Sequence, residues 1–268
     1  MTHISLHTNI ERLRNDLRGT KLLVVTKKRS VREIREVIAC GVKDIGENTL
    51  QEIQKKFDNN LFRELQKNGV RLHYIGHLQT NKIRKIVRLC DVIQSVDTLE
   101  KAEKVSQAAA DLKKTMPIFL ELNVTGEEQK HGIILFESED GSPHSSVHLR
   151  EMISQIQKLS NVRLLGFMCI GKHDDLEETR KVFKKCNQLA QEFGLPEVSM
   201  GMSEDYPVAL EEGSTMVRVG RIIFEGTCEV LVNSLEYRCS SLSGLKHPPY
   251  IGDLDSSSAS CSPSWQQG

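Results

Sequence analysis

The chain has 268 residues, of which 38% are hydrophobic and 27% are charged, a composition typical of a globular protein with a substantial core. Lys plus Arg and Asp plus Glu both total 36, so the formal net charge is zero. Bulk charge therefore favours neither a nucleic-acid partner nor an acidic membrane surface. No apolar stretch approaches the roughly 18 residues that a membrane-spanning helix requires.

The first predicted strand follows an N-terminal helix. Residues 1–20 lack the continuous apolar region of a secretory signal and predict the start of an amphipathic helix. The run "KLLVVTK" (residues 21–27) then predicts a buried strand. Helical spacing resumes over residues 30–41, with Ser30 as the expected N-cap and Gly41 as the expected stop.

Seven further units repeat this order of an apolar run and a helical segment. The apolar runs cover residues 42–47, 71–76, 91–97, 117–124, 162–171, 197–203 and 215–225. The helical segments cover residues 48–57, 80–90, 98–114, 145–159, 174–194, 204–213 and 226–237. Strict alternation of this kind predicts right-handed crossovers and a parallel sheet covered by helices.

Eight such units predict a single closed (β/α)8 barrel of the α/β class. A doubly wound open sheet is the alternative, because periodicity alone does not reveal closure. We expect residues 1–239 to form the barrel with its N-terminal helix. Residues 240–268 are rich in Ser, Pro and Gly and predict a disordered tail. The seven cysteines are scattered and form no C-x-x-C pair, which favours reduced thiols and a cytoplasmic location.

Polar side chains stand where the predicted strands end, which is where barrel proteins place their functional groups. A lysine that ends a buried strand, Lys27, has either reached solvent or is a nucleophilic amine. Arg218 lies between valines, where an unpaired guanidinium would cost several kcal/mol, so an acceptor or anion should face it. The other candidates are Asn48, His77, Met202, Ser203, Gly220 and Arg221.

Three of these candidates have simpler interpretations. Asn48 and Ser203 could each cap the helix that follows, and His77 could be an ordinary loop histidine. Taken together, however, the set suggests one chemistry. A lysine amine can condense with an aldehyde, Ser203 and the backbone N–H groups near Gly220 can hold a phosphate, and an arginine can meet a ring nitrogen. Pyridoxal phosphate (PLP) requires these three features.

Five motifs resemble the pyridoxal phosphate homeostasis protein family (YggS/PROSC). They are "VVTK", "IGENTLQE", "HYIGHLQTNK", "NVTGEEQKHGI" and "SMGMSEDYPVALEEGSTMVRVGRIIFEG", within residues 10–227. The resemblance implies the fold-type III PLP-binding barrel of the alanine racemase N-terminal domain, without a second β domain. One departure is Glu225, which stands in "IIFEG" where the family usually has glycine directly after Ile-Phe.

The resemblance also implies residue roles. Lys27, and not Lys28, would carry the internal aldimine with PLP. Arg218 would face the pyridine nitrogen. Ser203, Gly220 and Arg221 would hold the phosphate, Arg221 through its backbone N–H. Asn48, His77 and Met202 match motif positions that line the pocket.

The resemblance implies an intracellular PLP carrier that buffers or delivers the cofactor without established turnover. The alternative is a PLP-dependent racemase or decarboxylase. Racemases of this fold add a separate β domain, and the stretch that follows the last predicted strand is short for one. An arginine partner also leaves the ring nitrogen unprotonated, which disfavours carbanion chemistry. We expect no metal, nucleic acid or membrane, a monomer, and apo PLP-dependent enzymes as candidate partners.

Overall fold

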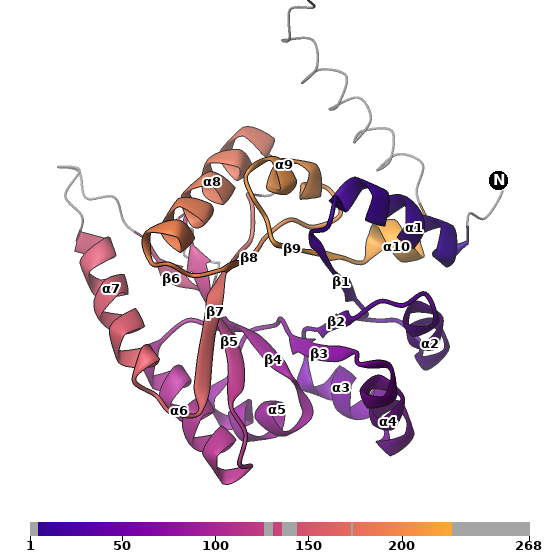
Figure 1. Ribbon diagram of the computed structural model, residues 1–268, viewed down its shortest axis with the longest axis horizontal. Helices are drawn as coiled ribbons and strands as arrows, with labels where there is room; N and C mark the ends of the chain where they lie inside the picture. Colours follow the sequence, from indigo (N-terminus) through magenta and orange to yellow (C-terminus); the bar gives the residue numbers. More distant parts are fainter. Residues whose placement is uncertain (1–4, 126–130, 136–143, 173, 227–268) are drawn as a thin grey trace, which may run out of the picture.

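The computed structural model describes residues 5–125, 131–135, 144–172 and 174–226, and their strands form a closed parallel barrel (Figure 1). Eight strands pair in the ring β4-β3-β2-β1-β9-β8-β7-β5, which the β4–β5 pairing closes. They are β1 (Lys21–Val25), β2 (Asp44–Glu47), β3 (Arg71–Tyr74), β4 (Val92–Val96), β5 (Met116–Asn123), β7 (Val162–Cys169), β8 (Glu197–Ser199) and β9 (Met216–Val219). The predicted (β/α)8 barrel is therefore confirmed, and the open sheet is wrong.

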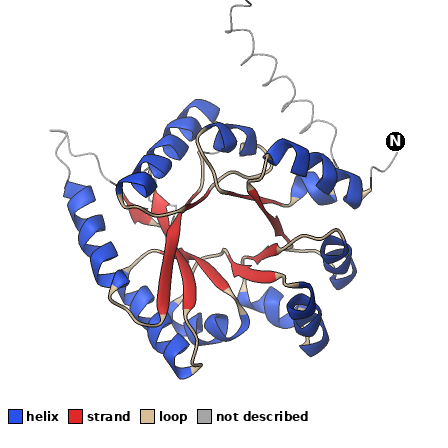
Figure 2. Ribbon diagram, in the orientation of Figure 1, coloured by secondary structure: helices blue, strands red, loops and turns tan. Residues whose placement is uncertain are grey.

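Helices surround the barrel on its outer side (Figure 2). They are α1 (Leu6–Leu17), α2 (Val31–Ala39), α3 (Leu50–Lys56), α4 (Asn59–Asn68), η1 (Thr80–Lys82), α5 (Ile83–Leu89), α6 (Leu99–Asp111), α7 (His144–Gln157), α8 (Leu176–Glu192), α9 (Tyr206–Glu211) and α10 (Arg221–Phe224). Among the described residues, no helix has both the length and the apolar character needed to cross a membrane.

The first βα unit shows why these elements form where they do. Ser30 caps α2 and forms a capping box with Glu33, as its position predicts. The buried face of the helix consists of Ile34, Val37 and Ile38, which recur at helical spacing and pack on the barrel. Gly41 follows the helix with φ +74°, a left-handed conformation that suits glycine.

The structure differs from the sequence-based prediction at several elements. Helix α4 is an additional helix between β2 and β3, and β6 (Ile133–Ile134) is a two-residue strand that pairs with the end of β5. The strands expected over 197–203 and 215–225 end early, at Ser199 and Val219. Most of the helix predicted over 226–237 and the tail predicted over 240–268 lie outside the described residues.

Candidate functional site

A cavity of about 470 Å³ lies at the carboxyl ends of the strands. Its walls include apolar side chains from three strands or the loops after them: Val25, Ile75, Met168 and Ile170. Its lining also contains seven of the eight predicted site residues, namely Lys27, Asn48, Met202, Ser203, Arg218, Gly220 and Arg221. Residues that lie far apart in the sequence therefore surround one space, as the barrel prediction requires.

Lys27 lies in the turn that follows β1. The turn is closed by a hydrogen bond from the Arg29 N–H to the Thr26 carbonyl at 3.0 Å, and Lys28 adopts φ +61°. The Lys27 side chain is exposed and lines the cavity, and its amine forms no ion pair within the described ranges. Lys28 is also exposed and lines the cavity. The choice between the two lysines therefore stays a prediction.

A buried polar network connects this turn to α3. The ammonium group of Lys56, on α3, donates to the Thr26 carbonyl and to Glu47 Oε1, both at 2.8 Å. The Thr26 hydroxyl donates to the same carboxylate oxygen at 2.6 Å. Glu52 accepts from the Lys28 N–H at 3.2 Å and pairs with Lys56 at 2.7 Å. The backbone on both sides of Lys27 is thus fixed to α3.

Glu47 lies in this network instead of in the cavity. It is fully buried, and burial raises the pKa of its carboxyl although Lys56 and Thr26 oppose that effect. This network was not predicted from the sequence. A signal was present, because Lys56 occupies a position on the buried face of α3 that Leu50 and Ile53 also share. A lysine at such a position requires a buried partner.

Arg218 projects from β9 and is only 5% exposed. Its Nη1 donates to the Ser199 carbonyl at 2.7 Å and to the Ser199 hydroxyl at 2.9 Å, and its Nη2 donates to the Cys169 carbonyl at 3.0 Å. Burial lowers the pKa of Arg218, and nearby carboxyl groups, Asp205 and Glu121, oppose that effect. The expectation that acceptors face this side chain is confirmed.

Ser203, Gly220 and Arg221 meet where α10 begins. Ser203 does not cap α9, whose N-cap is Asp205, and its hydroxyl accepts instead from the Ile222 N–H at 3.4 Å. At Gly220 a Cβ would lie 3.0 Å from the Val25 carbonyl oxygen, so a larger residue would crowd the cavity wall. The side chain of Arg221 pairs with Glu204 at 2.6 Å.

The remaining candidates occupy different environments. Asn48 is half-buried beside the cavity and does not cap α3, since Thr49 does so. Met202 is 39% exposed at the rim. His77 is exposed, stacks on His131 with ring centroids 3.8 Å apart, and is not part of the cavity lining. Its role in the pocket stays a prediction.

Glu121, on β5, is a further titratable group close to Arg218. It is 7% exposed, and burial raises its pKa to about 7, with Asp97 adding to the shift while Arg218 and Lys101 oppose it. In an unfolded chain a glutamate ionises near pH 4.3 (about the model-peptide value). Between these two pH values the folded protein retains a proton that the unfolded chain releases, so Glu121 lowers stability as the pH rises.

We therefore expect Glu121→Gln to increase the free energy of unfolding near pH 8 by roughly 3–4 kcal/mol at most, and by only about 1 kcal/mol near pH 5. Urea denaturation at both pH values measures the difference. Glu100→Gln is the matched control, since Glu100 is an exposed residue on α6 and should show no such pH-dependent gain. An equal effect of Glu121→Gln at both pH values would contradict this assignment.

Comparison with known proteins identifies a family. Residues 4–227 match the family described as "Alanine racemase, N-terminal domain". A pyridoxal phosphate homeostasis protein of Aquifex aeolicus is 35% identical over 76% of this chain and 86% of its own length. Another protein of that name, from Schizosaccharomyces pombe, is 31% identical over 82% of this chain and 92% of its own length.

Solved structures agree with this relationship. PipY of Synechococcus elongatus, solved without PLP, has a TM-score of 0.72 and 30% identity over 82% of this chain and 100% of its own. The same protein with PLP bound has a TM-score of 0.69. An alanine racemase of Clostridium difficile, at 16% identity and a TM-score of 0.62, shares the fold. The chain belongs to the pyridoxal phosphate homeostasis protein family, whose barrel is that of the alanine racemase N-terminal domain.

Proposed function

We propose that this chain binds PLP in the cavity at the carboxyl ends of its strands and holds it covalently through Lys27. The observation that supports this most directly is that Lys27, Ser203, Gly220 and Arg218 line one cavity. When bound, PLP supplies an aldehyde with which a primary amine condenses with loss of one water. PipY, which is solved with PLP bound, is a relative of the same fold.

The described residues fit the cofactor. Three of the five guanidinium N–H groups of Arg218 point to acceptors in the described part of the chain, and those that remain are the proposed donors to a ring nitrogen. Ser203, Gly220 and the backbone N–H of Arg221 are the proposed phosphate contacts. Glycine at position 220 lets this backbone pack against the Val25 carbonyl, which a Cβ would approach to 3.0 Å, and so keeps Gly220 and Arg221 at the cavity wall. Asn48, Met202 and His77 are proposed to complete the pocket.

We favour a carrier over an enzyme. A guanidinium stays protonated and donates to the ring nitrogen, so that nitrogen remains unprotonated and the ring is a poorer electron sink. The curated relatives described above are named homeostasis proteins. The likeness to alanine racemases concerns the fold and does not favour turnover of amino acids.

The remaining functional expectations are proposals that rest on the sequence. Apo PLP-dependent enzymes are the proposed recipients of the cofactor, and the protein is proposed to be a monomer. The four described cysteines Cys40, Cys90, Cys169 and Cys186 are free thiols, which fits the proposed cytoplasmic location. The division into a barrel over residues 1–239 and a tail over 240–268 also stays a proposal.

The carrier function is tested by transfer of the cofactor. Purified protein loaded with PLP and freed of unbound cofactor is mixed with an apo PLP-dependent enzyme, and the recovery of that enzyme's activity is followed. We expect activation at least as complete as with an equal amount of free PLP, and no turnover of amino acids by the carrier alone. Saturable turnover of an amino acid by the carrier at this site would contradict the proposal.

A further inference from the structure

A line of buried polar side chains crosses the interior of the barrel below the cavity. Arg218 contacts the hydroxyl of Ser199 at 2.9 Å, and this hydroxyl contacts Gln94 Oε1 at 2.7 Å. The amide nitrogen of Gln94 lies 2.9 Å from His73 Nδ1, and His73 Nε2 lies 2.8 Å from Asp44 Oδ1. None of the five residues is more than 5% exposed.

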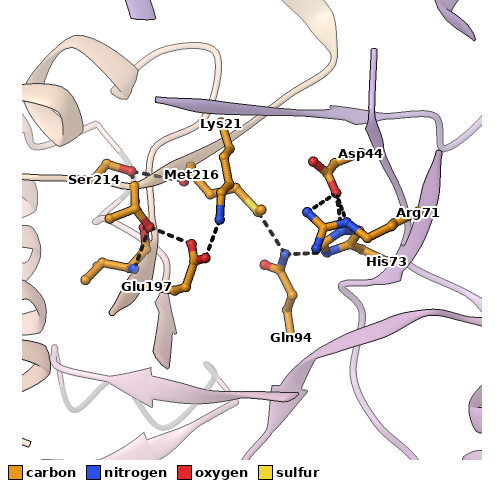
Figure 3. Close-up of polar contacts among 10 residues, drawn as sticks. Lys21, Asp44, Arg71, His73, Gln94, Glu197, Ser214 and Met216 are labelled. Atoms are coloured by element: carbon orange, nitrogen blue, oxygen red, sulfur yellow. Dashed lines mark hydrogen bonds and ion pairs between the residues drawn. The ribbon is translucent and has the colours of Figure 1, made fainter. Parts of the chain in front are cut away.

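The line ends at the opposite face of the barrel from the cavity. There, Asp44 Oδ1 also accepts from Arg71, with Nε at 2.8 Å and Nη2 at 2.7 Å. The Arg71 side chain is 43% exposed. Figure 3 shows this half of the line, with Gln94 between Met216 and His73 and with Asp44 and Arg71 beyond. The two charged ends are thus an arginine that lines the cavity and a carboxylate near solvent.

The chemistry of the two ends fixes the direction of every bond between them. A guanidinium only donates, so Ser199 accepts from Arg218 and must direct its own hydrogen to the carbonyl oxygen of Gln94. The Gln94 amide then donates to His73 Nδ1, so His73 carries its proton on Nε2 and donates to Asp44, which only accepts as a carboxylate. Along this line, Ser199, Gln94 and His73 each accept from one neighbour and donate to the next. Hydrogen bonds aligned in this way polarise one another.

The directions of the pKa shifts of His73 and Asp44 agree with this arrangement. Burial lowers the pKa of His73, although Asp44 opposes that effect, so the ring is neutral as the chain requires. Burial would raise the pKa of Asp44, but the hydrogen bond from His73 and the charge of Arg71 outweigh it and lower the pKa. The carboxylate is therefore ionised.

We propose that Ser199, Gln94 and His73 are positioning residues that hold the Arg218 guanidinium in place for the ring of a bound cofactor. This inference rests on the proposed function of the cavity. The Ser199 hydroxyl and carbonyl take both hydrogens of Nη1, and the Cys169 carbonyl takes one of Nη2, so the orientation of the remaining donors toward the cavity depends on these contacts. Gln94 in turn fixes the orientation of the Ser199 hydroxyl, and His73 fixes the orientation of the Gln94 amide.

The test uses Ser199→Ala, Gln94→Leu and the double variant in the full chain, with PLP as the probe. Each single variant is expected to raise the Kd for PLP by about tenfold, the effect of losing one buried hydrogen bond. The double variant is expected to bind PLP only slightly more weakly than either single variant, because both substitutions interrupt the same line of hydrogen bonds. Ser199→Ala and Gln94→Leu should each also shift the pH midpoint of the bound cofactor's absorbance, since the donor to its ring nitrogen is displaced.

Ser214→Ala is the matched control. Ser214 is also a buried serine of the barrel, but within the described part of the chain its hydroxyl contacts only backbone carbonyls, those of Met200 at 2.8 Å and Met216 at 3.0 Å among them. It should lower stability without changing the Kd or the absorbance titration. If Gln94→Leu does not fold, Ser199→Ala against Ser214→Ala decides alone.

The outcomes separate this inference from the function on which it rests. If the wild-type protein binds PLP while Ser199→Ala and Gln94→Leu bind and titrate as it does, the positioning role is wrong and the proposed function stands. Losses that simply add, or that Ser214→Ala reproduces, also contradict the positioning role. If the wild-type protein forms no coloured complex with PLP, the proposed function itself fails.

Discussion

Replacing Lys27 by alanine is expected to abolish covalent attachment of PLP. Borohydride reduction of the loaded wild-type protein should fix the cofactor on the peptide that contains Lys27, and mass spectrometry should find no such adduct in Lys27→Ala. The phosphate and ring contacts would remain, so we expect residual binding. Without the covalent bond this binding should be at least about tenfold weaker, which corresponds to a loss of about 1.4 kcal/mol or more of binding free energy. Absorbance after dialysis measures the retained cofactor.

Lys28→Ala is the matched control for this experiment. Both lysines are exposed and line the cavity, so the two variants remove the same charge from the same rim. The Lys28 backbone N–H, which donates to Glu52, is unchanged by the substitution. Lys28→Ala should keep the covalent adduct. An adduct that disappears in Lys28→Ala and persists in Lys27→Ala would show that the attachment site is the neighbouring residue.

The repeated order of strand and helix predicts the barrel because each unit buries one strand and covers it with one helix. Closure depends on the β1–β9 pairing, which joins the first strand to the last, as at Leu22 and Val217, and leaves no local pattern in the sequence. The end of β9 was placed too late for a related reason. Ile222 and Ile223 are as apolar as a strand, but they are the buried side of α10, and short apolar runs do not distinguish the two structures.

The residues of the cavity and of the polar line below it could be predicted from the sequence where the residue type is unusual for its position. Arg218 between two valines is such a case, because burial of a guanidinium demands acceptors. Gln94 is a polar residue within the apolar run 91–97 and carries the same signal. Ser199 carries little, since a small hydroxyl is common in buried strands. Its contact with Gln94 joins residues 105 positions apart, which only the folded barrel brings together.

Replacing Arg218 by glutamate is expected to weaken cofactor retention and to lower the free energy of unfolding by roughly 3–5 kcal/mol, the range for an uncompensated buried charge. The new carboxylate would face the carbonyl oxygens of Ser199 and Cys169, which accept hydrogen bonds and offer it none. A ring nitrogen that accepts from the guanidinium would lose its donor. Retention of PLP after dialysis and urea denaturation measure the two effects separately.

Two further variants distinguish loss of the donor from general instability. Arg218→Met removes the guanidinium without adding a buried charge, so it should destabilise the barrel less and still weaken retention, and it serves if Arg218→Glu does not fold. Arg84→Glu makes the same charge reversal on α5, where the side chain is 82% exposed, and should leave retention unchanged. Because the guanidinium is proposed to act on the ring and not on the aldehyde, borohydride should still fix any PLP that remains in Arg218→Met to Lys27. Wild-type retention in either folded Arg218 variant would mean that another group meets the ring.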